Sequence, residues 1–430
     1  MKPLPDNSTG LLCARRTFAL DVVQRLRHAG FEALWAGGCV RDQLLGKQPK
    51  DYDVASTARP EQVINLFGVR RTVPVGASFG VVMVLGPGKA AGQIEVATFR
   101  SDGAYMDGRR PVGVRFCSAE EDAQRRDFTI NGMFYDPVQE TVIDYVGGQK
   151  DLAAGIIRAI GDANARFTED KLRMLRAIRF AATLRFSLEP ATFAAIQSLH
   201  TQITQVSIER IAQEVRRMLS DKSRGESIKL LQSSGLLRCV LPEAEIDSEH
   251  VTKSASVLNL LQVSSFEPSL AAILLHDDPH HADLKERSVV ARDTCRRLRL
   301  SNEETETIVW LLTSLDVFRT LPSQPPHVVR PLLADERIPL LIDLSSATEA
   351  SYGRLASGAA AADEMLSADP SLKSLPRPLV TGNDLLERGI PGGPRIREVL
   401  TQLRNEQLDG LLADRAAAIQ RLDELLQCDW

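Results

Sequence analysis

The chain has 430 residues, of which 43% are hydrophobic and 25% charged, which is the composition of a globular protein with several domains. Its net charge of −4 excludes a broadly basic nucleic-acid coat and limits any RNA contact to local basic patches. Neither a run of the ~20 apolar residues that span a bilayer nor an apolar signal peptide is present, and the six cysteines form no CxxC pair. We therefore expect a cytoplasmic protein with no membrane contact and no structural zinc.

The first elements of the chain predict a turn that binds an anion. An amphipathic helix over residues 17–29 precedes a short apolar strand over 34–36, which runs into Gly37 and Gly38. Glycines allow a sharp turn and can present bare N–H groups to an anion. A helix follows with Arg41 in its first turn, where the helix dipole disfavours a cation. A phosphate clamp explains Arg41 better.

An acidic pair follows this helix. Asp51 and Asp53 flank Tyr52 at the start of an apolar run, so a strand there would turn both carboxylates to one face. Two neighbouring carboxylates repel each other unless a cation lies between them. Oxygen ligands of this kind suit Mg²⁺ that carries substrate phosphates. Taken alone, each motif is also compatible with an ordinary turn or a solvated loop.

The next segment predicts further strands of the same sheet. A helix is expected over 60–67 and strands over 81–85 and 94–99. Glu95 interrupts the last apolar run, so it is either a solvent-facing edge residue or a third carboxylate beside the acidic pair. Residues 101–111 are rich in turn formers and charge and predict a mobile loop.

The block RRDFTIN places charges beside an apolar element. Arg125 and Arg126 alone suit a charged helix start, but that explanation leaves Asp127 and Asn131 on one helical face, four residues apart, without a purpose. A strand is expected beyond it, over residues 142–145, and residues 156–160 close this part of the chain.

The chain becomes helical after Gly161. One amphipathic helix is expected over 167–186, with Thr168 as its N-cap. Its polar face carries Asp170 and then arginines at a spacing of three, and by charge pattern alone this is a solvated face with i,i+3 ion pairs. The arginines are Arg173, Arg176 and Arg179.

The remaining chain predicts helices with few chemical motifs. The helix over 207–219 carries Glu/Arg pairs that either stabilise this junction or contribute to the site. A metal site at His276 and Asp277 lacks further ligands at suitable spacing. Other helices are expected over 228–241, 255–263 and 351–366, with a linker or helix break over 322–331 and a Gly/Pro-rich turn before basic helices in 376–412.

Together these motifs resemble a known family. GGCVRDQLLG followed by DYD resembles the signature of DNA polymerase β-like nucleotidyltransferases. RRDFTIN, EDKLR and the tail string LVTGNDLLERGIPGGPRI are, more narrowly, similar to class II tRNA nucleotidyltransferases (CCA-adding enzymes) and bacterial poly(A) polymerases. The resemblance is most specific over 34–186, good over 376–412 and weaker between them.

This resemblance implies an α+β fold, with a polymerase β-like head followed by an all-α neck, body and tail. The expected domains are a head at 1–155, a neck at 156–225, a body at 226–330 and a tail at 331–430 that binds tRNA.

The resemblance also implies roles for individual residues. Asp51 and Asp53 would bind two Mg²⁺ ions about 3.5–4 Å apart, with Glu95 as a third catalytic candidate. Asp170 and Arg173 would read the base edge as an amino-acid template, since a carboxylate accepts from the amine of C or A and a guanidinium donates to the ring. The remaining nucleotide-binding candidates are Gly37, Gly38, Arg41, Arg126 (phosphates), Asp127 (ribose), Asn131, Arg176 and Arg179.

The implied activity is addition of C, C and A to the tRNA 3′ end from CTP and ATP, with release of pyrophosphate. A-only addition and poly(A) synthesis remain open. Residues 75–85 resemble the compact form of a tRNA enzyme, with no basic GRRFR-like segment, and the loop around residues 105–110 argues against an enzyme that stops after CC. An HD-type phosphohydrolase or a non-catalytic RNA-binding protein is the alternative from another class. The incomplete ligand set at His276 and Asp277 argues against the phosphohydrolase. The Asp51/Asp53 pair argues against a non-catalytic RNA-binding protein.

Overall fold

The computed structural model describes residues 10–76, 80–102, 114–242, 248–275, 284–390 and 393–427. The chain folds as two compact units. The first consists of Met1–Met218 and Glu226–Pro242, and the second of Leu219–Gly225 and Glu243–Trp430. The first unit holds a β-sheet and helices and the described part of the second is helical, which confirms the α+β expectation. The expected neck, body and tail boundaries stay a prediction.

Seven strands within the described residues form one mixed sheet in the order β3-β4-β5-β2-β1-β8-β9. In this sheet β2 and β5 are parallel, whereas the other five neighbouring pairs are antiparallel. The sheet is therefore mixed but mainly antiparallel. The strands are β1 (Ala33–Ala36), β2 (Asp53–Ser56), β3 (Thr72–Gly76), β4 (Val81–Leu85), β5 (Gln93–Thr98), β8 (Phe134–Asp136) and β9 (Thr141–Ile143).

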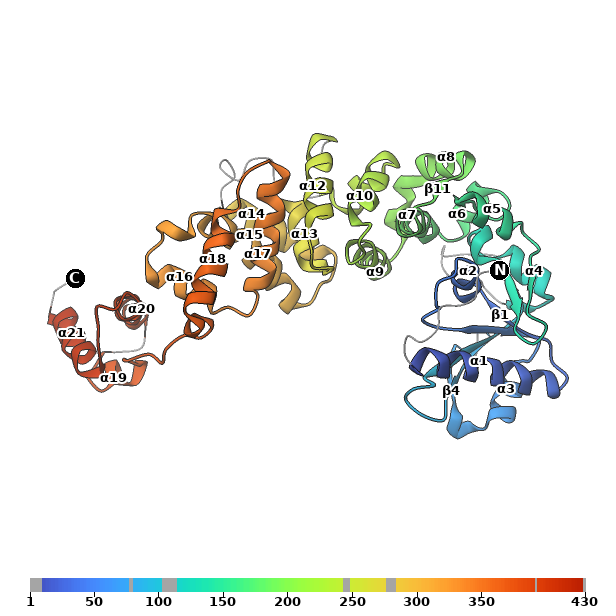
Figure 1. Ribbon diagram of the computed structural model, residues 1–430, viewed down its shortest axis with the longest axis horizontal. Helices are drawn as coiled ribbons and strands as arrows, with labels where there is room; N and C mark the ends of the chain where they lie inside the picture. Colours follow the sequence, from blue (N-terminus) through green and yellow to red (C-terminus); the bar gives the residue numbers. More distant parts are fainter. Residues whose placement is uncertain are drawn as a thin grey trace. The chain divides into compact units, whose positions relative to one another are not determined.

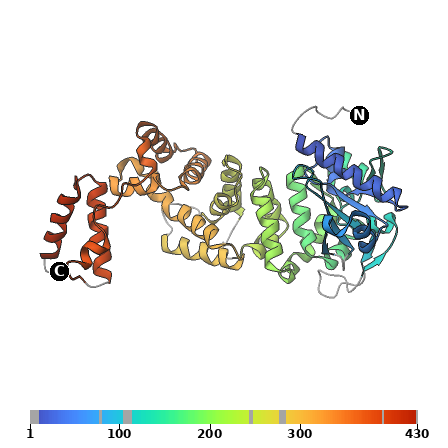
Figure 2. The same ribbon diagram turned by 90° about the horizontal axis from the view of Figure 1, so that it is seen from below.

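Strand β1 lies inside the sheet and is buried on both faces. Successive side chains of a strand point to opposite faces, so Leu34 and Ala36 pack with Phe99 in one apolar cluster. Trp35 packs instead toward helix α1 (Gly10–His28), where its indole N–H donates to the Ala19 carbonyl at 3.4 Å. Figures 1 and 2 show α1, the long blue helix, lying along the sheet.

The first unit contains further short elements around the sheet. Within its described residues, a two-stranded hairpin lies beside the sheet and a second pair of short strands joins the segments on either side of α7. These elements are α2 (Gly38–Leu44), α3 (Pro60–Phe67), β6 (Arg100–Asp102), β7 (Val114–Phe116), α4 (Ala119–Gln124), η3 (Thr129–Asn131), α5 (Gly148–Ala154), β10 (Ile156–Ile157), α6 (Ala163–Glu169), α7 (Leu172–Leu184), β11 (Ser187–Leu188), α8 (Pro190–Leu199), α9 (Ile208–Leu219), α10 (Arg224–Ser233) and α11 (Leu236–Val240).

The single helix expected over residues 167–186 is wrong. The structure has two helices, α6 and α7, and Asp170 lies between them with an extended backbone (φ −139°, ψ 103°). Thr168 is not an N-cap, because it lies inside α6 and its hydroxyl donates to the Asn164 carbonyl at 2.8 Å. The cap of α6 is Asp162, whose carboxylate accepts from the Ala165 N–H. The i,i+3 spacing of Asp170 and Arg173 therefore does not place them on one helical face.

The described part of the second unit is built from packed helices. Helices α12, α13, α15 and α17 form its centre, and α18 lies against α15 and α17 (Figure 1). Of the linker or helix break expected over residues 322–331, the structure shows a helix break, because α15 ends at Arg319 and α16 begins at Pro326, within that range. The helices are α12 (Ser248–Leu260), α13 (Phe266–Leu274), α14 (Leu284–Arg297), α15 (Asn302–Arg319), α16 (Pro326–Leu333), α17 (Ile338–Ser351), α18 (Ser357–Ala368), α19 (Gly382–Leu386), α20 (Pro394–Leu408) and α21 (Arg415–Gln427).

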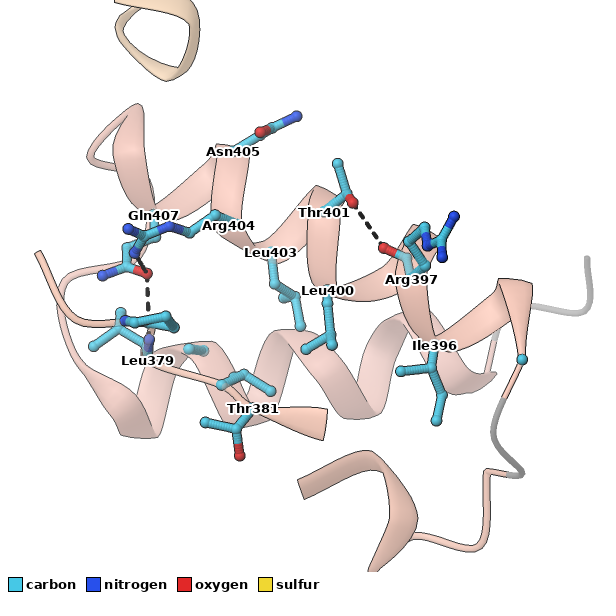
Figure 3. Close-up of a pocket in the computed structure, with 14 residues that line it drawn as sticks. Leu379, Thr381, Ile396, Arg397, Leu400, Thr401, Leu403, Arg404, Asn405 and Gln407 are labelled. Atoms are coloured by element: carbon cyan, nitrogen blue, oxygen red, sulfur yellow. Dashed lines mark hydrogen bonds between the residues drawn. The ribbon is translucent and has the colours of Figure 1, made fainter. Parts of the chain in front are cut away.

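The last three helices form a small apolar core of their own. Leu385, Leu403 and Leu422, one from each of α19, α20 and α21, are buried in it. A cavity of about 740 Å³ opens beside α20, with Ile396 and Leu400 on its wall (Figure 3). This cavity lies in the second unit and contains none of the acidic residues singled out from the sequence. Within the described residues, no helix combines the length and the apolar character needed to cross a membrane.

Candidate active site

The acidic residues gather where β2 and β5 run side by side. Asp53 is in direct register with Glu95 on the neighbouring parallel strand. In-register residues of adjacent strands project from the same face, so the two carboxylates lie together. The structure therefore places Glu95 beside Asp53 on an interior strand, and its side chain also faces solvent, so the two alternatives that the sequence left open do not exclude each other.

Electrostatics set Asp53 apart from most carboxylates in the protein. Asp53 is exposed at the start of β2, but desolvation by the surrounding protein atoms and the nearby charge of Glu95 raise its pKa to about 6, with a smaller contribution from Asp51. The guanidinium of Arg126 opposes this shift but does not cancel it. A cluster of like charges of this kind is relieved by a cation.

Asp51 lies just outside the strand. The expectation that it forms part of the strand is wrong, because β2 begins at Asp53. Its side chain is 86% exposed and lies 3.3 Å from the guanidinium of Arg15, which also donates to the Lys50 carbonyl at 2.7 Å. Arg15 therefore partly neutralises the outer carboxylate in the absence of another cation.

The acidic cluster has the chemistry of a Mg²⁺ site without a complete protein cage. Among the described residues, no group of three His, Cys, Asp or Glu side chains is arranged to hold a metal ion. Mg²⁺ commonly binds through one or two carboxylates and takes its other ligands from water and substrate phosphates. The raised pKa of Asp53 fits such a cation, since ionisation is unfavourable without one.

The glycine turn lies beside these carboxylates. Gly37 has a φ of +71°, and a side chain there would place its Cβ 3.2 Å from Nη1 of Arg126. Its own N–H is used by the fold, because it donates to the Met133 carbonyl at 3.2 Å. Gly38 begins α2, so it is the second glycine that opens the helix.

Arg41 is more enclosed than a simple phosphate clamp. Helix α2 has seven residues and Arg41 is the fourth, so Arg41 closes the first turn and, because the helix is short, also lies in its last turn. Its guanidinium donates to Asp42 at 2.7 Å and to the Asn131 side-chain oxygen at 2.8 Å, and it lies over the Phe180 ring. Arg41 thus connects α2 to the RRDFTIN block, and its contact with phosphate stays a prediction.

Arg125 and Arg126 share one buried carboxylate. Arg125 Nη2 donates to one oxygen of Asp122 at 2.6 Å and Arg126 Nη2 to the other at 2.8 Å. Burial alone would raise the pKa of Asp122, but the charges and hydrogen bonds of the two arginines hold it below its usual value. These pairs orient Arg126 with Nη1 toward Gly37. Sequence reasoning missed Asp122, although its spacing of three and four to the arginines was a usable signal.

Asp127 and Asn131 meet as the sequence predicts, but in a turn that leads into the 3-10 helix η3 rather than in an α-helix. The amide of Asn131 donates to Asp127 Oδ1 at 3.2 Å, and Arg176 donates to Asp127 Oδ2 at 2.6 Å. Burial would raise the pKa of Asp127, but the charge and hydrogen bonds of Arg176 keep it low. The arginine expected to face phosphate or RNA is thus joined to the residue expected to read the ribose.

The two candidate template residues lie at the break between α6 and α7, with separate partners. Arg210 donates to both oxygens of Asp170, at 2.8 and 3.2 Å. Arg173 donates to Glu169 at 2.8 Å and to the Arg125 carbonyl at 3.0 Å, and it is 8% exposed.

Arg179 of α7 is held from α9. It donates to the buried carboxylate of Glu214 at 2.6 Å, and Arg217 donates to the other oxygen of that carboxylate at 2.8 Å. The simple i,i+3 ion-pair face expected for α7 is therefore wrong, since Arg176 and Arg179 bind carboxylates of distant segments. Sequence reasoning missed Arg210 as a partner of Asp170, because only folding brings α9 to the helix break.

Some predicted features lie outside the described residues. These are most of the loop around Tyr105–Arg110, residues 77–79 of the segment compared with tRNA enzymes, and the His276/Asp277 motif.

Comparisons with known proteins agree with this geometry. Residues 33–158 match the family described as "Poly A polymerase head domain", and residues 185–247 match "Probable RNA and SrmB- binding site of polymerase A". The CCA-adding enzyme of Lactobacillus gasseri is 32% identical over 94% of this chain and 96% of its own length. That of Geobacillus thermodenitrificans is 42% identical over 51% of this chain, and the match spans 53% of that relative, about half its length.

Solved structures extend the likeness over nearly the whole chain. The CCA-adding enzyme of Bacillus stearothermophilus in complex with CTP superposes with a TM-score of 0.77 at 27% identity, covering 98% of this chain and 100% of that one. A Thermotoga maritima CCA-adding enzyme complexed with tRNA shares the fold, with a TM-score of 0.63 at 22% identity over 97% of this chain and 98% of that one. Because homology extends over almost the full length of a relative at more than 30% identity, the chain belongs to the CCA-adding enzyme family of nucleotidyltransferases.

Proposed function

We propose that this chain adds C, C and A to the 3′ end of tRNA, using CTP and ATP without a nucleic-acid template. The observation that carries the proposal is the register of Asp53 with Glu95, with Asp51 nearby. On its other side Asp53 pairs with Ala36, the residue that precedes the Gly37 turn. Relatives named for the same reaction, one of them solved with CTP and another with tRNA, support this assignment.

In this proposal Asp51 and Asp53 bind Mg²⁺, and Glu95 supports them from the adjacent strand. Bound Mg²⁺ would lower the pKa of the RNA 3′-hydroxyl and stabilise charge on the transferred phosphate and on pyrophosphate. The protein's own contribution is position and charge: Asp53 and Glu95 concentrate negative charge on one face of two interior strands, while Arg126 lies close by.

The triphosphate would lie between these carboxylates and the glycine turn. Gly38 and Arg41 are proposed to hold its phosphates from α2, and Arg126 is proposed to reach them from the opposite side of Gly37. Asp127 and Asn131 would contact the ribose. Because Asp127 is already bonded to Arg176, an incoming hydroxyl would join an existing network rather than a lone carboxylate.

The base would be read at the break between α6 and α7. Asp170 accepts from the exocyclic amine that C and A share, and Arg173 donates to the ring acceptor beside it. Arg210 and Glu169 hold these side chains at present. Arg176 and Arg179 are proposed to face the triphosphate or the RNA backbone from the same helix. Arg173→Ala should relax the choice among the four nucleotides more than it weakens tRNA binding, and unaltered selectivity would contradict the template role.

The test is incorporation of labelled CTP and ATP into tRNA lacking CCA, tRNA ending in CC and an unrelated oligonucleotide. Addition of two C and one A to the first RNA is the expected result. Addition of A to the CC-ended tRNA alone would identify an A-adding enzyme, and long A tails on the unrelated RNA would identify a poly(A) polymerase. No incorporation in Mg²⁺ would contradict all three.

A cytoplasmic location is also part of the proposal. The cysteines in the described part of the chain, Cys39, Cys117, Cys239 and Cys295, are free thiols, as a reducing compartment requires.

A further inference from the structure

The second unit contains a small cavity that no step of the proposed reaction uses. It has a volume of about 280 Å³ and lies where the end of α15, the second half of α17 and the start of α18 meet. Its wall includes Arg319, Ser345, Glu349, Arg354, Ser357 and Gly358. The volume is several times the ~30 Å³ that one water molecule occupies, so the cavity can admit a small polyatomic ligand.

Two polar groups at this cavity are buried without partners. Within the described residues, the hydroxyl of Ser345 and Nη2 of Arg319 have no hydrogen-bond partner. Ser345 is 0% exposed and the Arg319 side chain is 12% exposed. A buried polar group without a partner destabilises the folded state, so two at one cavity point to a polar ligand that would complete them.

The charge at the cavity favours an anion. The other edges of the Arg319 guanidinium lie 2.6 Å from Glu349 and 3.5 Å from Asp316. Two further arginines are near, so three arginines stand against two carboxylates. Arg287 lies 3.0 Å from Asp316 and Arg354 joins the cavity wall. Burial lowers the pKa of Arg319, and the charges of Arg287 and Arg354 add to this shift. The charges of Glu349 and Asp316 raise the pKa but do not cancel the shift.

The first turn of α18 adds backbone donors on the same side. The residue before the helix, Ala356, provides no side-chain cap, so N–H groups of this turn have no capping partner from that residue. Gly358 lies so close to the end of α15 that a Cβ would come 2.0 Å from the Phe318 carbonyl oxygen. Glycine thus lets the first turn of α18 pack directly against the end of α15, where Arg319 is located.

We propose that this cavity is a binding site for a phosphate-class oxyanion, held by Arg319, Ser345, Arg354 and the first turn of α18. The oxyanion is either free phosphate or a phosphate of the RNA backbone, and both present the same acceptor oxygens. The cavity is separate from the nucleotide site, since all of its residues belong to the second unit.

The test compares three full-length variants in thermal unfolding, with phosphate titrated against chloride at equal ionic strength. When phosphate is about ten times its dissociation constant, the midpoint of the wild type should rise by about 2–4 °C. Ser345→Ala should fold normally and lose this rise, and Arg354→Met should reduce it. Ser227→Ala is the matched control, because Ser227 is also 0% exposed with an unpartnered hydroxyl but does not line the cavity.

An equal phosphate response in the wild type and Ser345→Ala would overturn the proposal, as would loss of the response in Ser227→Ala. The source of the anion is then decided by tRNA binding. Weaker tRNA binding in Ser345→Ala than in Ser227→Ala assigns the site to an RNA phosphate, and equal binding assigns it to free phosphate. Because the readout is binding rather than incorporation, it is independent of the catalytic proposal.

Discussion

Two groups of carboxylates in the first unit differ in how their charge is satisfied. Asp122 and Asp127 are each bound by arginines and have lowered pKa values, whereas Asp53, beside Glu95 and Asp51, has a raised pKa. The charges of the first group are balanced within the protein, so these carboxylates hold their arginines in place without an external cation. The second group is electrostatically unfavourable by itself, and it is therefore the one that an external cation would stabilise.

This difference separates stability from activity. A bound carboxylate stabilises the fold, and removing it leaves an arginine without its partner. An unbalanced cluster of carboxylates lowers the stability of the metal-free protein and is retained for chemistry. Substitutions in the two groups should therefore have opposite signs in stability and different magnitudes in activity.

The largest expected effect is on activity, at Asp53. Asp53→Asn should reduce nucleotide incorporation roughly 1000-fold, because it removes charge that supports the metal at the reacting phosphate. tRNA binding should be unchanged in a filter-binding assay. Incorporation within tenfold of the wild type would show that the carboxylates of β2 and β5 are not the catalytic site.

The next effect is on stability, at Asp127. Asp127→Ala leaves Arg176 without its carboxylate and should lower the free energy of unfolding by about 2–3 kcal/mol, measured by urea denaturation. Asp51→Ala, which removes an exposed carboxylate, is the control and should change stability by less than about 0.5 kcal/mol. Equal effects of the two substitutions would remove the distinction between the groups.

The third effect is a pH-dependent gain in stability at Asp53. The folded protein binds the Asp53 proton more tightly than the unfolded chain does, where the pKa of Asp53 is near 3.8. Ionisation of Asp53 therefore destabilises the fold, and this destabilisation develops as pH rises from about 4 to 6 and is complete above that. Without metal, the free energy of unfolding of Asp53→Asn should thus be about 1 kcal/mol higher than that of the wild type at pH 7, allowing for solvent screening. The two free energies should be equal near pH 4. Added Mg²⁺ should close the gap at pH 7, and a gap that widens below pH 4 would contradict the sign.

The smallest effect is expected at Arg15. Arg15→Ala removes a cation that lies 3.3 Å from Asp51, so it should lower the Mg²⁺ concentration for half-maximal incorporation by about twofold. The stability should change by less than about 1 kcal/mol, since the pair is exposed. A higher Mg²⁺ requirement would mean that Arg15 positions Asp51 rather than competing with the metal.

Much of the site was predictable because its motifs are local. The glycine turn, the Asp51/Asp53 pair and the contact of Asp127 with Asn131 need only a few neighbouring residues, and turn geometry and side-chain periodicity act over that range. The helix break at Asp170 was not predictable from the sequence, because residues 167–186 contain no glycine or proline that would end a helix there.

The sequence by itself determined the α+β class, the family and the identity of the acidic and basic candidates, since these depend on composition and short motifs. The tertiary structure alone decided which charges meet. Register across the parallel pair of strands placed Glu95 beside Asp53, and packing of α9 on the helix break brought Arg210 to Asp170 and Glu214 to Arg179. Such pairs join residues far apart in the chain, so no local spacing encodes them, and the sign of each pKa shift follows from them.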